Sequence, residues 1–288
     1  MLRNLVINFA STSESQRKVP QRFAADYGQA YKAIHRGAGN WRSSVTEFLK
    51  QASFVFIWNG LQEKCHLVTA YCERHGIPHA YYEYGMLPQG TTFYLDPNGF
   101  CGRSRLMGDL GWITPRDMEL LERERTNLQA ANPISDNGDI LLPMQLFDDT
   151  QVAYNTPYET MHEFVEYMKT IFDHDRIVVR KHPQGGCDFD GMGVRVEEPG
   201  EIPFLKSAAR CHAVVGLTST CLMEAKILGK PVLALGDCPL RFHNPELHNT
   251  VAAGQLALTV DRQHGSASSI LERFGLRPLG CAPVGSGS

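Results

Sequence analysis

Carboxylate, amide and basic side chains follow two apolar segments near the middle of the chain, at the point where each segment ends. Gln145, Asp148 and Asp149 come after the run 140–143, and Arg180, Lys181 and His182 come after the run 177–179. In an open parallel sheet, ligands bind outside the carboxyl ends of the strands. We therefore expect both groups at one edge. Carboxylates beside an Arg-Lys-His cluster suit an anionic substrate whose leaving group carries phosphate.

The two aspartates are adjacent, so at most one of Asp148 and Asp149 points at the substrate. The other caps the following segment or faces water. A carboxylate that acts as a nucleophile has to be ionised and close to cations, which the second group supplies. The alternative interpretation is an ordinary Asp-Asp-Thr turn.

His182 and Glu83 are the candidates for proton transfer and hydrogen bonding. His182 can donate a hydrogen bond to an oxygen of a departing phosphate, whereas a basic cluster on the surface is the alternative, above all for Lys181. Glu83 ends another apolar run and precedes Gly85 and Pro88, so it is a candidate general base toward a hydroxyl. Taken alone, Glu83 fits a solvated loop carboxylate better.

A hydroxyl triplet, Thr218, Ser219 and Thr220, follows a further apolar strand and opens a predicted helix. Such residues cap a helix and leave free backbone N–H groups that bind an anion. Glu224 lies one turn further in, where it can accept hydrogen bonds from ribose hydroxyls. An ordinary helix cap with an exposed glutamate is the alternative. We favour a nucleotide site, because these residues and the following Gly-Lys-Pro-Val segment occur together in nucleotide-sugar sites.

Strand and helix patterns alternate along the chain, which predicts an α/β fold. We expect strands at 2–9, 54–58, 79–84, 139–143, 176–180, 194–196, 212–216 and 231–235, and helices at 23–34, 44–52, 61–74, 115–130, 157–172, 203–209, 220–229, 249–256 and 267–274. A turn-rich break at 132–138 predicts domains 1–134 and 135–275, followed by a disordered tail, 276–288. Two Rossmann-type β/α/β domains facing a cleft is the GT-B architecture, but the pattern also fits many two-domain binding proteins.

The composition excludes several classes of protein. With 43% apolar and 20% charged residues, the 288-residue chain is typical of globular proteins, and its net charge of −3 argues against a nucleic-acid binder. No apolar run approaches the ~18 residues of a membrane span, and we expect no signal peptide. The eight cysteines form no C-x-x-C pair, so we expect reduced thiols in a cytosolic protein. No histidine has metal-ligand spacing.

Four motifs occur in one order: E-Y-G-M-L-P at 83–88, L-P-M-Q-L-F-D-D at 142–149, R-K-H-P at 180–183 and T-S-T-C-L-M-E-A-K-I-L-G-K-P-V at 218–232. In this order they resemble the bacterial capsule polysaccharide biosynthesis family of KpsC- and KpsS-like enzymes. They also resemble the related β-Kdo transferase module of WbbB-type enzymes. The resemblance covers roughly residues 80 to 240.

The resemblance implies a GT-B glycosyltransferase that moves Kdo from CMP-β-Kdo to a saccharide or glycolipid acceptor with retention. We expect no cofactor and no metal, because protein cations and helix N–H groups can stabilise the leaving phosphate. It also implies that 1–134 holds the acceptor and 135–275 the donor, in a cytoplasmic enzyme of capsule or lipopolysaccharide synthesis. Such an enzyme would associate peripherally with the inner membrane or with other assembly enzymes. The implied catalytic residues are Asp149 as nucleophile, Glu83 as acid/base and His182, and the implied donor-binding residues are Ser219, Thr220 and Glu224. From the residues around them we also expect Gln145, Arg180 and Lys181 to bind the donor.

Two other classes stay open on the sequence. One is an inverting glycosyltransferase or glycerophosphotransferase with another nucleotide donor, in which Glu83 alone is the base and Asp149 only positions the sugar. The other is a non-catalytic module that binds a nucleotide sugar without turnover.

Overall fold

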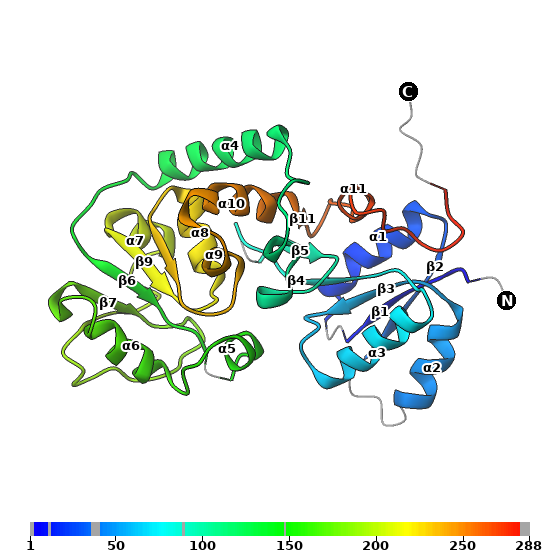
Figure 1. The fold of residues 1–288 in the computed structure, drawn as a ribbon, viewed down its shortest axis with the longest axis horizontal. Coiled ribbons are helices and arrows are strands. Elements are labelled where there is room, and N and C mark those ends of the chain that lie inside the picture. The colour runs from blue at the N-terminus through cyan, green and yellow to red at the C-terminus, as the bar shows by residue number, and fades with distance from the viewer. Residues whose placement is uncertain (1–2, 11–12, 36–40, 88–89, 147, 283–288) are drawn as a thin grey trace. The chain divides into compact units, whose positions relative to one another are not determined.

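The computed structural model describes residues 3–10, 13–35, 41–87, 90–146 and 148–282, with the side chains at 41–44 and 150 left out. The chain divides into two compact units (Figure 1). Unit 1 is Met1–Arg105 with Leu258–Ser288, and unit 2 is Leu106–Ala257. Each unit has its own sheet, so we describe them separately.

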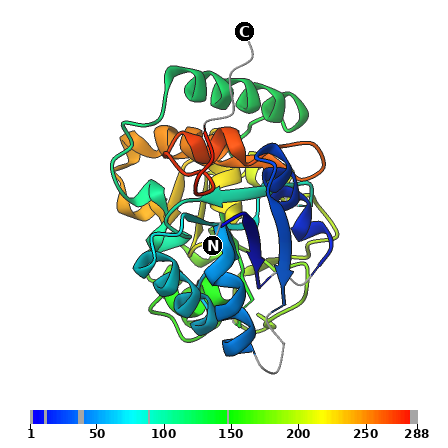
Figure 2. The same ribbon diagram turned by 90° about the vertical axis from the view of Figure 1, so that its right-hand side faces the viewer.

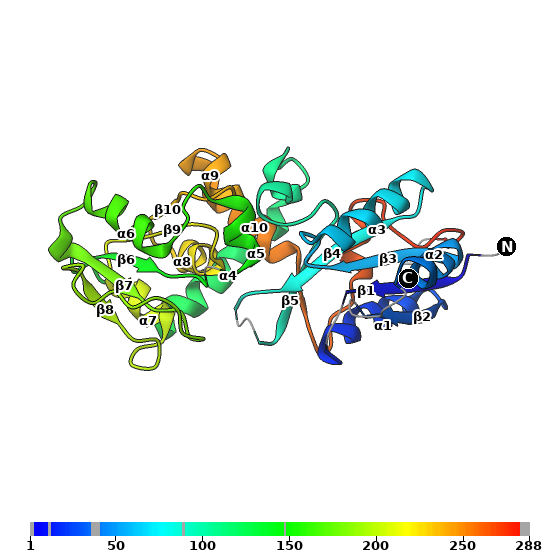
Figure 3. The same cartoon turned by 90° about the horizontal axis from the view of Figure 1, so that it is seen from below.

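Unit 1 has a six-stranded sheet in the order β11-β5-β4-β3-β1-β2, in which β1 to β4 are parallel and β5 is antiparallel to both its neighbours (Figure 3). Its strands are β1 (Leu5–Phe9), β2 (Ala30–Ile34), β3 (Ala52–Trp58), β4 (His79–Tyr84), β5 (Thr92–Asp96) and β11 (Thr259–Asp261). Its helices are α1 (Lys18–Asp26), α2 (Trp41–Gln51), α3 (Glu63–Arg74) and α11 (Ser268–Glu272). The central strand β3 is almost wholly buried, as its apolar run predicts.

Unit 2 has a five-stranded, wholly parallel sheet in the order β10-β9-β6-β7-β8. Its strands are β6 (Ile140–Pro143), β7 (Ile177–Arg180), β8 (Arg195–Glu197), β9 (Ala213–Gly216) and β10 (Val232–Ala234). Its helices are α4 (Pro115–Ala131), α5 (Thr150–Asn155), α6 (Met161–Lys169), α7 (Phe204–Arg210), α8 (Thr220–Leu228), α9 (Pro239–Phe242) and α10 (His248–Ala257). In the two units together, short 3-10 turns span Ser15–Arg17, Cys101–Arg103, Arg105–Met107, His174–Arg176 and Pro245–Leu247.

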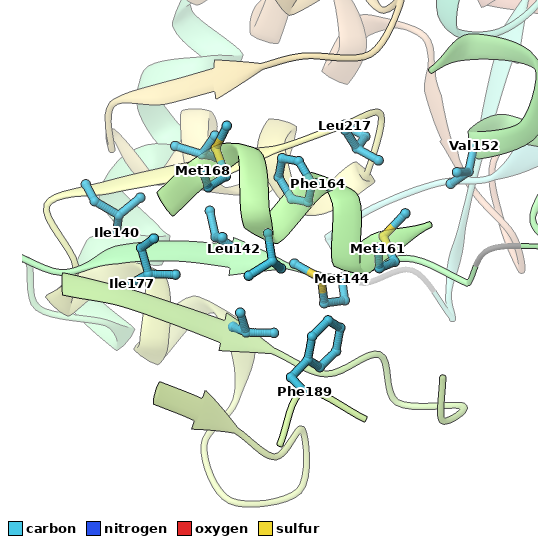
Figure 4. Packing of buried hydrophobic residues seen from close by; sticks show 13 residues of the cluster. Ile140, Leu142, Met144, Val152, Met161, Phe164, Met168, Ile177, Phe189 and Leu217 are labelled. Atoms are coloured by element: carbon cyan, nitrogen blue, oxygen red, sulfur yellow. The ribbon is translucent and has the colours of Figure 1, made fainter. Parts of the chain in front are cut away.

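The core of unit 2 lies where α6 covers β6 and β7 (Figure 4). The buried positions of α6 recur with helical spacing, at Met161, Phe164, Val165 and Met168. Burying a side chain of this size stabilises the fold by roughly 1.5–3 kcal/mol. This packing holds the two strands whose ends carry the predicted site.

Two predicted helices are wrong in extent. The pattern at 23–34 breaks at Gly28, whose φ of +62° ends α1, and the chain then forms β2. The pattern at 157–172 shortens to α6, because the Thr160 side chain accepts a hydrogen bond from the Glu163 N–H and caps the helix there. Strands β5 and β11, which are short and pair with each other, show no strand pattern in the sequence and were not predicted.

The compact units do not coincide with the predicted division at residue 134. Helix α4 belongs to unit 2, because it packs on α8 and α10 and donates hydrogen bonds from Arg125 and Gln129 to the last carbonyls of α8. The chain from Leu258 returns to unit 1. There the guanidinium of Arg22 in α1 donates hydrogen bonds to the backbone carbonyls of residues 262, 263 and 265. The red C-terminal segment, which belongs to unit 1, accordingly lies beside α1 (Figure 2).

The predicted disordered tail begins too early at 276. Leu279 donates its backbone N–H to the Ser53 carbonyl, and Cys281 donates to Pro278, so the segment up to 282 is anchored to unit 1. The rest of the predicted tail, 283–288, lies outside the described residues. Over the described part of the chain, we find no helix with both the length and the apolar character needed to cross a membrane.

Candidate functional site

The two polar groups in the middle of the chain follow neighbouring parallel strands. Pro143 of β6 is the register partner of Arg180 of β7, which confirms that both strands end at the same edge of the sheet. Strand β9, which leads to the hydroxyl triplet, pairs with the other side of β6. The site is therefore built from the loops that follow three adjacent strands, β7, β6 and β9.

Asp149 is the N-cap of α5. Its Oδ1 accepts a hydrogen bond from the Gln151 N–H at 2.9 Å, and the side chain is half-buried, whereas Asp148 is exposed. The second carboxylate oxygen of Asp149 is not needed for this cap. With Asp149 as the implied nucleophile, the sequence assigned a cap or a water-facing position to Asp148. In the structure the implied nucleophile Asp149 itself makes the cap, and Asp148 is the exposed residue. Phe147, part of the same motif, lies outside the described residues.

His182 lies within electrostatic range of Asp149. Partial burial lowers the pKa of His182 below its usual range, and the negative charge of Asp149 opposes this shift. The Gln184 N–H donates to His182 Nδ1 at 3.2 Å. Because Nδ1 accepts this bond, the neutral ring carries its proton on Nε2. His182 is thus prepared to donate one hydrogen bond from Nε2 without carrying a charge.

Arg180 is buried, with 6% of its surface exposed, and its guanidinium forms an ion pair with Glu197, its register partner on β8. Glu197 also accepts hydrogen bonds from Ser207 and Arg210 of α7, both at 2.6 Å. The Arg180 guanidinium also donates to the Pro199 carbonyl at 3.3 Å. These contacts favour a positioning role for Arg180. Its direct contact with a donor stays a prediction.

Lys181 forms a partly exposed ion pair with Glu198 at 2.7 Å. Its hydrogen bond to Glu198 is the main reason that the Lys181 pKa is raised, and the charges of Asp188 and Asp190 add to it. Its predicted contact with the donor is not tested by this geometry. Lys181 therefore stays positively charged among the carboxylates of Glu198, Asp188 and Asp190.

Gln145 uses both ends of its side-chain amide to hold Thr218. Its Oε1 accepts from the Thr218 N–H at 3.0 Å, and its Nε2 donates to Thr218 Oγ1 at 3.2 Å. The Thr218 methyl group faces Gly236, where an added Cβ would lie 2.6 Å from Thr218 Cγ2. The loops after β6, β9 and β10 are thereby tied together.

The hydroxyl triplet opens α8 as predicted. Ser219 is the N-cap, and its Oγ accepts from the Cys221 N–H at 3.2 Å, while Thr220 is exposed. Burial raises the pKa of the Cys221 thiol to about 12, and the half-buried Glu224, one turn further on, adds to this shift. Cys221 is therefore a neutral thiol.

Glu83 belongs to unit 1, whereas the other predicted site residues belong to unit 2. It is half-buried on β4, and its Oε1 accepts a hydrogen bond from Asn59 Nδ2 at 3.2 Å. Pro88, the last residue of that motif, lies outside the described residues. Sequence reasoning missed both Asn59 and Glu197, although a Trp-Asn-Gly turn directly after an apolar strand was a signal for the first.

We find no group of three or more His, Cys, Asp or Glu residues arranged to hold a metal ion within the ranges that the structure describes. None of the eight cysteines, all within these ranges, forms a disulfide.

No protein-family profile and no curated protein sequence matches this chain significantly. Solved structures do. One is Thermosulfurimonas dismutans KpsC described as a beta Kdo 2,7 transferase, with 17% identity over 94% of this chain and 98% of that one and a TM-score of 0.64. Another is KpsC of the same organism described as a beta Kdo 2,4 transferase, with 17% identity over 88% and 90% and a TM-score of 0.58.

The similarity to these structures extends over nearly the whole chain and shows its fold. The chain is an α/β protein, as its alternating strands and helices predict, and its fold is GT-B-like, as the resemblance implies. The predicted resemblance to KpsC-like proteins is confirmed in the structural neighbours. At 17% identity the likeness concerns the fold, so the activity has to be argued from the site.

Proposed function

We propose that this chain is a glycosyltransferase that transfers Kdo from CMP-β-Kdo to a saccharide or glycolipid acceptor with retention of configuration, in capsule or lipopolysaccharide synthesis. The observation that carries the proposal is that Asp149 and a neutral His182 follow adjacent parallel strands and lie within electrostatic range of each other. A nucleophile beside a hydrogen-bond donor for the leaving group is what a double displacement needs. The likeness in fold to two KpsC structures supports the same activity.

The donor is proposed to bind unit 2 through its nucleotide. The phosphate lies at the start of α8, where Ser219 and Thr220 supply hydroxyl and backbone donors and the helix dipole favours an anion. Glu224 accepts from the ribose hydroxyls, and His182 Nε2 donates to a phosphate oxygen. Gln145 acts on the donor through Thr218, which it holds by two hydrogen bonds.

The reaction is proposed to proceed through two displacements. Asp149 attacks the anomeric carbon with the oxygen that does not cap α5, a carbon–oxygen ester bond forms, and CMP leaves with the electron pair of the bond that breaks. An acceptor hydroxyl then attacks the same carbon, gives its proton to Glu83 and releases the Asp149 carboxylate. Two inversions restore the original configuration, as in retaining glycosidases.

The donor is identified by incubating the protein with a panel of CMP- and UDP-sugars and saccharide acceptors, followed by mass spectrometry and anomer analysis of the products. We expect a β-Kdo product from CMP-Kdo. An inverted product would contradict the double displacement, and donor binding without any product would indicate a binding module.

We further propose that the protein works in the cytoplasm, in peripheral contact with the inner membrane or with other polysaccharide-assembly enzymes.

Asp149→Asn tests the nucleophile directly. Asparagine caps a helix as well as aspartate, so α5 should keep its cap and the protein should fold. We expect transfer to fall by several orders of magnitude, since the amide cannot form the ester. Intact-protein mass spectrometry with donor and no acceptor should show one added sugar on the wild type and none on the variant.

Asp148→Asn is the matched control, because Asp148 is the exposed neighbour in the same turn. It should cost far less activity and still allow the adduct. Retained transfer at a near wild-type rate in Asp149→Asn would place the nucleophile elsewhere. One observation favours the inverting alternative, in which Asp149 only positions the sugar: the cap on α5 already gives Asp149 a structural role.

A further inference from the structure

The turn that ends β3 has a backbone conformation that few residues adopt. Asn59 has a φ of +62° and Gly60 a φ of +83°. A Cβ on Gly60 would lie 2.5 Å from the ring of Tyr81, so only glycine fits there. Among residues with a side chain, asparagine is one of the few that tolerate the left-handed region. The Asn59 N–H donates to the Tyr82 carbonyl at 3.1 Å, which fixes the turn beside β4.

The Asn59 side chain is held in one orientation and contacts Glu83. Its Oδ1 accepts from the Leu61 N–H at 3.3 Å, and its Nδ2 donates to Glu83 Oε1 at 3.2 Å. Because a backbone N–H can only donate, Leu61 determines which end of the amide faces Glu83. The turn therefore presents an amide donor, and not an acceptor, to the carboxylate.

We infer that Asn59 is a positioning residue for the acceptor-side chemistry: it fixes the Glu83 carboxylate so that one of its oxygens receives the proton of the acceptor hydroxyl. This inference rests on the proposed role of Glu83 as the general base. A hydrogen bond donated to a carboxylate favours its charged form, which is the form that accepts a proton. Left-handed backbone at a non-glycine residue is also frequent at functional sites, where the surrounding structure enforces it.

Two variants separate this role from a purely structural one. Asn59→Gly keeps the left-handed backbone and removes the donor. Aspartate in Asn59→Asp also tolerates this backbone, and one of its oxygens still accepts the hydrogen bond from the Leu61 N–H. Its other oxygen replaces the amide donor and faces the Glu83 carboxylate. We expect the transfer rate to fall about tenfold in Asn59→Gly and further in Asn59→Asp, with the acid limb of the pH–rate profile moved to higher pH and CMP affinity unchanged.

A double variant with Glu83→Gln gives the strongest test. If Asn59 acts through Glu83, Asn59→Gly should have no further effect on the rate once Glu83 is replaced. Equal losses in both backgrounds would overturn the inference, because they would show a role in the turn alone.

A readout without activity keeps the inference separate from the proposed function. Glutamate labelled with carbon-13 at the carboxyl group reports the titration of Glu83, assigned by its loss in Glu83→Gln. The midpoint should be lowest in the wild type, higher in Asn59→Gly and highest in Asn59→Asp. An identical midpoint in all three would overturn the positioning role. If the Glu83 midpoint shifts in this order but no Kdo transfer is detected, the contact between Asn59 and Glu83 stands and the proposed function is wrong.

Discussion

Asp96 in unit 1 and Glu197 in unit 2 are both buried, with 0% and 4% of their surfaces exposed, but they are stabilised by different partners. Asp96 accepts hydrogen bonds from the hydroxyls of Tyr94 and Ser104, both at 2.7 Å, and from three backbone N–H groups, those of residues 98, 99 and 105. Every one of these donors is neutral. Glu197 is instead placed between the guanidinium groups of Arg180 and Arg210.

The two arrangements also differ in what they hold. Asp96 organises one loop, because its donors all lie within ten residues of it in the sequence. Glu197 joins β7, β8 and α7, and the loop with His182 begins directly after β7. Charge pairing thus stabilises the buried carboxylate of unit 2, and neutral hydrogen bonding stabilises that of unit 1. The difference predicts how each unit responds to the loss of one carboxylate.

Glu197→Gln should have the largest effect on stability. It leaves the Arg180 guanidinium, whose side chain is 7% exposed, buried without a counter-charge. Breaking a buried ion pair on one side costs about 3–5 kcal/mol. We expect the free energy of unfolding, measured by chemical denaturation, to fall by about that amount.

Glu198→Gln is the matched control, since it removes the carboxylate next in sequence and breaks only the partly exposed pair with Lys181. Because water screens this exposed pair, we expect a much smaller loss of unfolding free energy than in Glu197→Gln. Equal costs for the two variants would show that the buried pair contributes no more than a surface pair, and the contrast between the two units would lose its basis.

Asp96→Asn should have a smaller effect that depends on pH. Burial raises the pKa of Asp96 above its usual range, and the hydrogen bonds from Tyr94 and Ser104 oppose the shift. The folded protein therefore holds this proton more tightly than the unfolded chain does. The stabilisation from Asp96 is complete below the pKa of an unfolded aspartate, near 4, and declines as pH rises through the folded value.

Asparagine does not titrate, so the cost of Asp96→Asn should be greatest under acidic conditions, at about 1–3 kcal/mol, and smaller near pH 7. Denaturation of both proteins at several pH values measures this difference. A cost that grows as pH rises would mean that the neutral donors favour the carboxylate over its protonated form, opposite to the direction that burial gives.

The sequence predicts the site in unit 2 better than that in unit 1, for a physical reason. In unit 2 each functional group directly follows an apolar strand, at 143, 180 and 216, and parallel pairing alone brings such groups to one edge. The fold class follows from the same alternation. What the sequence could not show is that Arg180 is paired with Glu197, because that contact depends on the register of β7 and β8.

Unit 1 depends on contacts that leave no local pattern. Asp96 is part of an Asp-Pro-Asn-Gly turn, which predicts a loop and gives no sign that Ser104 completes its hydrogen bonding. Strand β11 has three residues, too few to show alternation, and it pairs with β5 from far along the chain. The Asn59–Glu83 contact likewise needs β3 and β4 to be neighbours. Long-range pairing of this kind cannot be derived from one sequence.

Thr218→Val should have the smallest effect and would sharpen the comparison, because it removes one neutral hydrogen bond from the unit that is rich in ion pairs. The variant keeps the methyl group that faces Gly236 and the N–H that binds Gln145 Oε1, and it loses only the bond between Oγ1 and Gln145 Nε2. One such bond contributes about 1 kcal/mol, so calorimetry should show CMP binding about fivefold weaker.

Thr218→Ser is the complementary variant, because it keeps the hydroxyl for Gln145 and loses the methyl group that faces Gly236. If the hydrogen bond positions the start of α8, the serine variant should bind CMP nearly as well as the wild type. If packing against Gly236 does so, the serine variant should be the weaker of the two. Equal affinity in all three proteins would mean that the backbone bond from Thr218 to Gln145 is sufficient, and that neutral side-chain bonds matter less in unit 2 than in unit 1.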